Sequence, residues 1–387
     1  MTNQKRQFGQ FFTKNSDYIL QGLSKYVKDK EVIDPFAGGQ DLISWAKNQG
    51  VKKIEGFDID SKYIDNKVVF ENDSINSPER YKFVLTNPPY LNINKADKNI
   101  KNKYFNSFDF EDLYQISLYS IMDSQEGIVI VPINFLSAEN SKKIRNIFFS
   151  KFRVIEMNYF KEQVFPDTTY NVIAFYYKKK KDYFGNKFSI KTHIYPEGKT
   201  VNIELKKVFD WTIGGEISSL IKDEKNSLGI YRLTEKDILN KPGLIEVTAA
   251  YNHIKNTLKL RVPKDVYKII KSNIILLKAI DSGTEQGKIA LENIKEKYGI
   301  DCLISKTSSR HMIYLIFKEN VSVAEQEKII ELFNKEMSKF REAHLSLFLT
   351  NYRDNDRKRV SFDFAYKFIN HLYYDQIKHA QRKPTLF

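Results

Sequence analysis

Residues 82–90 of the chain read Lys82-Phe83-Val84-Leu85-Thr86-Asn87-Pro88-Pro89-Tyr90. The apolar run from Phe83 to Leu85 predicts a buried strand, because β-branched and aromatic residues suit a pleated surface. Two prolines follow, and each lacks an N–H and fixes the backbone. The stretch therefore predicts a stiff turn just past the carboxyl end of a strand, with the Asn87 amide before it and the Tyr90 ring after it. In open α/β sheets, ligands bind at this edge.

Length and composition indicate a soluble globular protein. The chain has 387 residues, of which 42% are hydrophobic and 28% charged, which suits two domains. It has neither an apolar window long enough for a membrane span nor an apolar signal core at its start. We therefore expect a cytoplasmic protein, nucleoid-associated if bacterial, and not a secreted one. The single cysteine, Cys302, excludes an internal disulfide, and the scattered histidines show no metal-ligand spacing, so no metal is expected.

The charge balance indicates a polyanionic partner. The net charge is +14, the pI is near 9.3, and 14% of the residues are aromatic. Such a protein can neutralise phosphates with its cations and stack bases on its rings. Nucleic acid is the class of partner that this combination favours.

Strands and helices alternate along the first half of the sequence. A helix capped by Asn15 or Ser16 is predicted to reach about Tyr26, and residues 91–111 are predicted to form a polar loop. The alternation predicts an α/β fold with a parallel sheet. The strands are expected at about 31–34, 53–60, 68–70, 82–86, 127–132, 152–157 and 170–177, with helices at about 42–46 and 113–121 between them.

The pattern of expected strands and helices changes near Gly215, where we place a domain boundary. The first domain is predicted to span residues 1–215. The remainder, 216–387, mixes expected strands at 302–304 and 312–317 with an expected helix at 324–340. It predicts a mixed α/β recognition domain.

Four acidic residues follow predicted strands. Asp34 precedes a glycine turn, where the backbone can approach a ligand closely. Asp58 ends the second strand, where a carboxylate can accept hydrogen bonds from ribose hydroxyls. Asp60 could take the same role, because side chains alternate between the two faces of a strand and Asp58 and Asp60 would share one face. Asp73 ends the third strand, where it could accept from an adenine amino group.

In this order the motifs resemble those of S-adenosylmethionine-dependent DNA adenine-N6 methyltransferases of the kind found in type II restriction-modification systems. The resemblance covers about residues 8–177. It implies a Rossmann-like methyltransferase sheet with helices on both faces, followed by a C-terminal target-recognition domain. One departure is Gln40, where relatives often have glycine; we expect it to narrow the pocket. The matching motifs are 8–13, 34–39, 57–58, 72–73, 87–90, 112–114, the strand at Gly127, and 164–166.

The resemblance also implies how S-adenosylmethionine is bound. Gln10, Phe11 and Thr13 would flank its methionine end. The central turn would be formed by Asp34 and Gly38. Asp58 would hold the ribose and Asp73 the adenine amino group. Further cofactor contacts are expected from Phe36, Ile59 and Asn87.

The implied chemistry explains the opening stretch. An adenine amino nitrogen is a poor nucleophile, and acceptors at the Asn87 oxygen and the Pro88 carbonyl would favour a more pyramidal, more nucleophilic nitrogen. The target base must be flipped out of the duplex. Tyr90 would stack on one face of it and Phe165 on the other. For Phe165, packing in the core is the alternative.

In the second domain, six basic residues, named at the end of this paragraph, are expected to contact the bases and phosphates of double-stranded DNA. The alternative is that their side chains form a charged face that contacts only solvent. The enzyme is expected to act as a monomer. Two other functions stay open: a methyltransferase of the same fold acting on RNA or on a protein glutamine amide, and a non-catalytic nucleic-acid-binding module. The six basic residues are Arg310, Arg341, Arg353, Arg357, Lys358 and Arg359.

Overall fold

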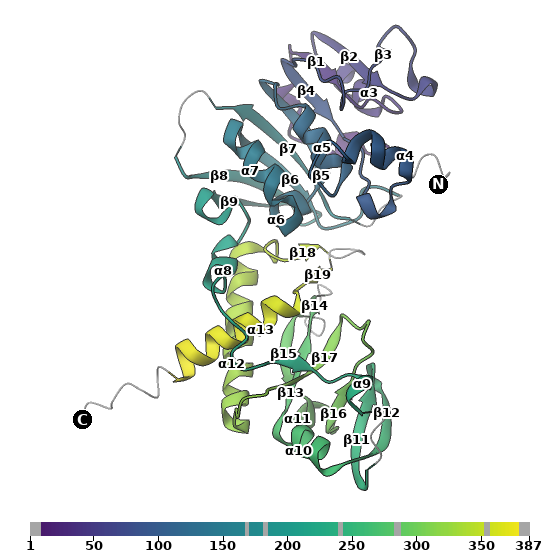
Figure 1. Cartoon of the computed structure of the whole chain (residues 1–387). Helices are drawn as coiled ribbons and strands as arrows, with labels where there is room; N and C mark the ends of the chain where they lie inside the picture. Colours follow the sequence, from purple (N-terminus) through teal and green to yellow (C-terminus); the bar gives the residue numbers. More distant parts are fainter. Residues whose placement is uncertain are drawn as a thin grey trace, which may run out of the picture. The chain divides into compact units, whose positions relative to one another are not determined.

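The computed structural model divides into two compact units, the first within residues 1–215 and the second within 216–350 and 357–387 (Figure 1). Gly215 ends the first unit, and it is also where the sequence places the domain boundary. None of the described helices is long and apolar enough to cross a membrane. The structure describes residues 9–166, 170–180, 185–238, 243–281, 288–351 and 357–378.

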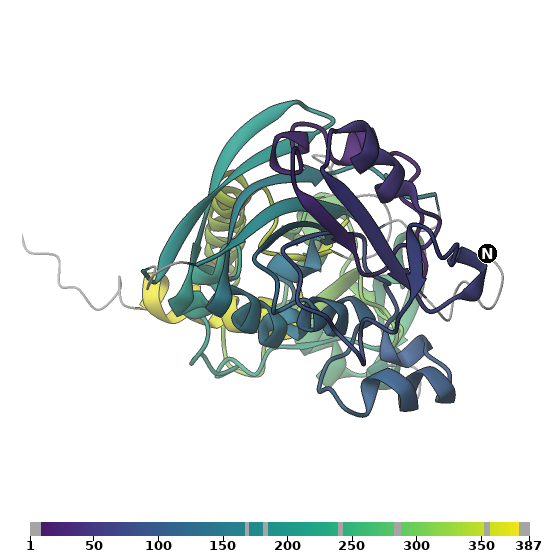
Figure 2. The same ribbon diagram turned by 90° about the horizontal axis from the view of Figure 1, so that it is seen from above.

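The first unit is built on one twisted nine-stranded sheet (Figure 2). Its order is β3-β2-β1-β4-β5-β7-β6-β8-β9. The first five strands in this order run parallel, and β7 is antiparallel to both β5 and β6. This confirms the predicted α/β class and the Rossmann-like sheet. The strands are β1 (Glu31–Asp34), β2 (Lys53–Asp58), β3 (Val69–Glu71), β4 (Phe83–Thr86), β5 (Glu126–Pro132), β6 (Phe152–Phe160), β7 (Val172–Lys179), β8 (Lys187–Tyr195) and β9 (Lys199–Lys206).

Helices cover the sheet on both faces, because its central strands are apolar on both sides. All four residues of β4 are buried. On one face, Leu42 and Trp45 pack in a core with Phe83 of β4. On the other, the Phe148 ring packs against Phe175 of β7. The helices are α2 (Ser16–Ile19), α3 (Asp41–Asn48), α4 (Lys98–Ile100), α5 (Leu113–Ser120), α6 (Asn134–Ser137) and α7 (Lys142–Lys151).

Two predictions for the first unit are wrong. The helix expected up to Tyr26 is broken: α2 ends at Ile19, and a separate 3-10 turn (Ser24–Tyr26) follows Gly22, whose φ of +76° ends the helical conformation. Residues 91–111 are not an irregular loop. They form short helical turns, because Ile100, Tyr104 and Phe105 are buried and anchor them.

The second unit contains three small sheets, with orders β10-β17-β13-β15, β12-β11-β16 and β14-β19-β18. The predicted strands at 302–304 and 312–317 and the helix at 324–340 are confirmed by β16, β17 and α12. The elements are α8 (Gly215–Leu220), β10 (Tyr231–Arg232), α9 (Glu235–Ile238), β11 (Ile245–Tyr251), β12 (His253–Val262), α10 (Lys264–Ser272), β13 (Ile275–Lys278), β14 (Ile280–Asp281), β15 (Ala290–Asn293), α11 (Ile294–Tyr298), β16 (Cys302–Ile304), β17 (Met312–Ile316), α12 (Val323–His344), β18 (Thr350–Asn351), β19 (Lys358–Arg359) and α13 (Phe362–His371).

The four-stranded sheet of this unit separates two hydrophobic cores. Leu277 and Leu315 on one face share a core with helix α12. Leu276 and Tyr314 on the other face share a core with β11, β12 and β16. Helix α12 and the β11–β12 hairpin therefore lie on opposite sides of this sheet, as Figure 1 also shows.

Candidate active site

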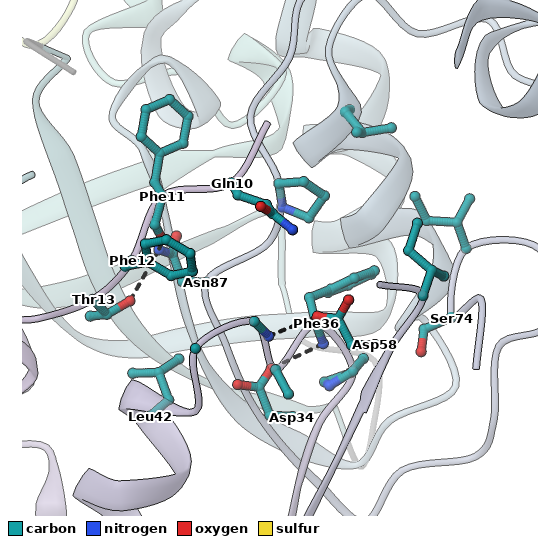
Figure 3. Close-up of a pocket in the computed structure, with 18 of the residues that line it drawn as sticks. Gln10, Phe11, Phe12, Thr13, Asp34, Phe36, Leu42, Asp58, Ser74 and Asn87 are labelled. Carbon is teal, nitrogen blue, oxygen red and sulfur yellow. Dashed lines mark hydrogen bonds between the residues drawn. The ribbon is translucent and has the colours of Figure 1, made fainter. Parts of the chain in front are cut away.

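A pocket opens at the carboxyl ends of β1, β2 and β4 (Figure 3). It holds about 830 Å³ of space, including the part open to solvent. All ten residues predicted to bind the cofactor line it. The lining residues are Gln10, Phe11, Phe12, Thr13, Asp34, Pro35, Phe36, Ala37, Gly38, Gly39, Asp41, Leu42, Asp58, Ile59, Asn72, Asp73, Ser74, Ile75, Asn87, Pro89, Ile100, Tyr104 and Leu113.

The glycine turn and the end of β2 are joined by hydrogen bonds. The Gly38 N–H donates to Asp58 Oδ2 over 2.8 Å, and the Asp60 N–H donates to Asp58 Oδ1, also over 2.8 Å. These bonds hold the Asp58 carboxylate at the pocket wall. Asp60 is not a lining residue; its side chain caps a short turn by accepting from the Lys62 N–H. Of these two acids, the pocket contains Asp58.

Gln40 does not narrow the pocket, contrary to expectation. It has a left-handed backbone conformation with φ of +64°. Its side-chain amide donates to Asp65 Oδ2 over 3.1 Å. The side chain thus points to Asp65, and Gln40 is absent from the lining.

Asp34 is buried beneath the pocket floor, with 1% of its surface exposed. Its Oδ1 accepts from the Thr86 hydroxyl over 2.8 Å and from the Phe36 N–H over 3.1 Å. Burial disfavours the charged form and raises the pKa of this carboxyl to about 7. At neutral pH the neutral and the charged forms of this buried carboxyl are therefore both populated.

Replacing Asp34 with asparagine should stabilise the ligand-free first unit. Asparagine Oδ1 can accept both existing hydrogen bonds without carrying a charge. Because the folded-state pKa lies above the unfolded one, wild-type stability falls as pH rises from about 4 to about 7 and is level above that. The gain from Asp34→Asn should grow over the same window and reach on the order of 2 kcal/mol at pH 8. Urea titrations followed by tryptophan fluorescence test this, since Trp45 and Trp211 both lie in the first unit. A gain that does not change with pH would contradict the assignment.

Asp73 lies at the far wall of the pocket. Its Oδ2 forms an ion pair with Lys103 at 3.0 Å and accepts from the Tyr104 hydroxyl over 3.2 Å. Burial opposes ionisation, but the Lys103 ammonium and the Asn76 donors outweigh it and lower the pKa of Asp73. Asp73 is therefore an ionised acceptor at neutral pH.

The Asn87 amide is oriented by the N-terminal segment. Its Nδ2 donates to the Phe11 carbonyl over 2.8 Å and to Thr13 Oγ1 over 3.1 Å. Both amide hydrogens are thereby used, and Oδ1 is left as an acceptor. In the structure Oδ1 accepts from the Tyr90 hydroxyl over 2.6 Å. The same hydroxyl also lies 2.8 Å from the Ile130 carbonyl, a second acceptor for its proton.

The N-terminal segment meets the Asn-Pro-Pro-Tyr turn at Gly9. The Tyr90 N–H donates to the Gly9 carbonyl over 2.9 Å. Gly9 has a φ of +60°, and a Cβ placed on it would lie 2.7–2.9 Å from backbone atoms of Tyr90. Only glycine allows this approach.

Tyr90 and Phe165, the two rings predicted to stack on the target base, do not leave an open slot for it in this structure. The Phe11 ring lies next to both expected faces, with its centroid 5.3 Å from that of Tyr90 and 6.4 Å from that of Phe165. Phe165 is 2% exposed and packs in the core of the first unit, which is the alternative that the sequence left open. Neither Tyr90, Phe165 nor the buried Pro88 lines the pocket.

Several lining residues were not predicted from the sequence. Ile100 and Tyr104 come from the stretch expected to be a loop, and Leu113 begins helix α5. A signal for the first two existed in their i, i+4 spacing, which places apolar side chains on one side of a helical turn. Ser74 and Ile75 follow the predicted acid Asp73 and could have been expected from that position.

The basic residues predicted for DNA contact divide by burial. Arg310 and Arg357 are exposed, and Arg359 is half-buried. Arg341 has 12% of its side chain exposed and forms an ion pair with Asp281 at 3.1 Å. Lys358 is 2% exposed. As a correction to the prediction, Lys358 is buried, and Arg341 is only partly exposed and is neutralised by Asp281. Arg353 lies outside the described residues.

Comparison with known families matches residues 10–165 to the family model described as Eco57I restriction-modification methylase. In this segment the chain is similar to restriction-modification methylases. The segment contains every lining residue of the pocket, from Gln10 to Leu113. A comparison with curated protein sequences finds no match.

Solved structures with similarity to the chain include three restriction-modification proteins. The type IIG restriction endonuclease BpuSI has 14% identity and a TM-score of 0.41, covering 63% of this chain and 42% of its own. The type IIL restriction-modification enzyme MmeI, solved in complex with DNA, has 11% identity and a TM-score of 0.47, covering 92% and 64%. A modification subunit of a putative type I restriction enzyme from Vibrio vulnificus has 15% identity and a TM-score of 0.37, covering 75% and 60%. The chain thus spans less than half the length of BpuSI.

Proposed function

We propose that this protein transfers a methyl group from S-adenosylmethionine to the N6 amino group of a flipped-out adenine in double-stranded DNA, as the modification enzyme of a restriction-modification system. One observation carries the proposal. An acid-lined pocket ends at the Asn87 amide, whose hydrogens are both engaged and whose oxygen is an acceptor that the Tyr90 hydroxyl meets in this structure. The match of residues 10–165 to the restriction-modification methylase family supports it.

The side chains of the pocket fit this cofactor. S-adenosylmethionine carries a sulfonium and an ammonium against one carboxylate, so its net charge is positive. Four carboxylates line the pocket, those of Asp34, Asp41, Asp58 and Asp73, and its described lining includes no lysine, arginine or histidine. The pocket lining is thus acidic, although the net charge of the whole chain is +14. The apolar Ile75 and Ile100 offer a surface for the flat adenine ring.

When bound, the cofactor supplies a methyl group activated by its positive sulfur. The chain supplies acceptors for the target amino group at Asn87 Oδ1 and the Pro88 carbonyl. With both amino hydrogens held, the nitrogen lone pair is directed at the methyl group, and positioning provides most of the rate enhancement. If adenine takes the Asn87 oxygen, the Tyr90 hydroxyl keeps the Ile130 carbonyl as its acceptor. Stacking of the Tyr90 ring on the base would then offset about 1–3 kcal/mol of the flipping cost.

Stacking of a flipped base on Tyr90 also requires a change at Phe11, because the Phe11 ring packs against both Tyr90 and Phe165. Rotation of this one side chain would open a slot beside Tyr90. The Phe11 carbonyl, which holds Asn87, belongs to the backbone and need not move with the ring. Opening the slot is therefore compatible with an oriented amide.

A transfer assay with methyl-labelled cofactor tests the function against its alternatives. The acceptors are duplex DNA, RNA and a protein mixture containing release factors. Label in the N6 position of adenine from duplex DNA is the expected result. Label in RNA or in protein glutamine, with none in DNA, would replace the proposed substrate. No label in any acceptor, despite nucleic-acid binding, would favour a non-catalytic module.

A further inference from the structure

The β11–β12 hairpin of the second unit presents a line of cations. Strand β12 is exposed along most of its length. Its even-numbered Ile254, Leu260 and Val262 face the core. Lys259 and Arg261 alternate with them and face outward, and His253 and Lys255 are exposed nearer the turn. From His253 to Arg261 an extended strand spans about 26 Å.

A second basic segment lies beside the tip of this hairpin. The Asn252 N–H donates to the Ile304 carbonyl over 2.8 Å, which joins the tip to the end of β16. Residues 306–311 follow at once, and the Lys306 ammonium lies 5.9 Å from the centre of the Tyr251 ring. The segment 306–311, which also carries Arg310, therefore lies beside the tip of the hairpin. The cations of β12 and of this segment are here together called the basic face.

The segment 306–311 is held in place by arginines. The Arg232 guanidinium donates to the carbonyls of Thr307 over 2.6 Å and Ser309 over 2.9 Å. It also lies over the Phe362 ring at 5.4 Å, and Arg310 lies over the same ring at 6.0 Å. A braced segment loses less conformational entropy on binding than a free one.

Most cations of the basic face have no carboxylate partner. Among the described residues, Lys255, Arg261, Lys306 and Arg310 form no ion pair, and only Lys259 is neutralised, by Glu246 at 3.2 Å. On helix α12 the situation differs, because Lys328 and Lys339 are each paired with a glutamate of the same helix. Within the described part of the chain, these four cations of the basic face are therefore not neutralised by a carboxylate.

We propose that the basic face binds the phosphate backbone of duplex DNA, an inference that rests on the proposed function. DNA carries one negative charge per about 1.7 Å of helix axis, so an extended line of unpaired cations can meet several phosphates at once. Lysine suits such contacts as a point charge. The set of DNA-contacting residues predicted from the sequence shares only Arg310 with the basic face.

The test compares two triple variants of the full chain. Lys255→Gln/Arg261→Gln/Lys306→Gln removes three charges from the basic face. Lys328→Gln/Lys335→Gln/Lys339→Gln removes three from α12, on the opposite side of the four-stranded sheet. Binding of a labelled duplex is measured by fluorescence anisotropy from 50 to 200 mM salt. Each lost phosphate contact lowers the slope of log Kd against log salt by about 0.9.

The first triple should lower the slope by about 2–3, and the α12 triple should leave it unchanged. Lys255→Arg/Arg261→Lys/Lys306→Arg should keep the wild-type slope, which separates charge from misfolding. Equal slopes for the wild type and the first triple, or no duplex binding by the wild type, would overturn the inference. Binding that depends on the basic face without methyl transfer would instead overturn the proposed function alone.

Discussion

Replacing Asn87 with alanine is expected to lower methyl transfer to adenine by at least about 100-fold, the usual loss when one group that stabilises a transition state is removed. The variant loses the Oδ1 acceptor, so one hydrogen of the target amino group has no partner and the nitrogen is less nucleophilic. Cofactor binding should be largely unchanged, because Asn87 is one of many lining residues. Single-turnover rates at saturating DNA, with cofactor affinity from calorimetry, separate the two effects.

The matched control for this prediction is Asn94→Ala, which removes an exposed amide seven positions later (94 − 87). It should transfer methyl groups at the wild-type rate. Thr13→Val tests orientation separately, since it removes one of the two acceptors that hold the Asn87 amide. It should slow transfer less than Asn87→Ala does. Near-normal turnover by Asn87→Ala would refute the proposed role.

Replacing Arg145 with alanine should lower the free energy of unfolding of the first unit by about 3–5 kcal/mol. This side chain of α7 is fully buried. Its guanidinium donates to the carbonyls of Phe135, Ala138 and Asp210 and to the Thr212 hydroxyl, over 2.7–3.0 Å. Alanine would leave a cavity and four acceptors without this donor, two of them in fully buried hydrogen bonds. Urea unfolding followed by tryptophan fluorescence measures the loss.

Two further variants show which interactions cause that loss of stability. Arg145→Met keeps most of the volume but removes the donors, so it should remain more than about 2 kcal/mol less stable than wild type if the hydrogen bonds matter. Lys143→Ala changes a half-exposed residue of the same helix and should stay within about 0.5 kcal/mol. If Arg145→Ala and Lys143→Ala unfold at the same urea concentration, the buried guanidinium contributes no net stability.

The pocket could be predicted from the sequence because its main parts are local. A strand ends, and the residues just after it lie at a shared sheet edge; this rule alone brings Asp34, Asp58, Asp73 and Asn87 together. The family resemblance added the N-terminal residues, such as Phe11. The positions of the four strand-end residues depend on strand direction and not on the details of packing.

What could not be predicted depends on pairs of residues far apart in the chain. Arg341 read as a surface cation, but its partner Asp281 lies 60 positions away and helps to bury it. The basic face was missed because the cations of β12 are separated by apolar residues, and only the strand's alternation brings Lys259 and Arg261 onto one side. Phe165 is buried because it packs in the hydrophobic core of the first unit, and its local sequence does not show these partners.

The N-terminal segment also has a consequence for which bases the site can accept. A half-turn of the Asn87 amide would exchange its oxygen and nitrogen, and the bonds to the Phe11 carbonyl and Thr13 oppose that turn. Under the proposed function the group offered to the target base is thus an acceptor, which favours the amino group of adenine or cytosine over a carbonyl oxygen at the same position, such as O6 of guanine or O4 of thymine. Under the proposed function, a segment more than 70 positions before the turn thus helps to select the base, because it fixes which atom of the Asn87 amide can accept.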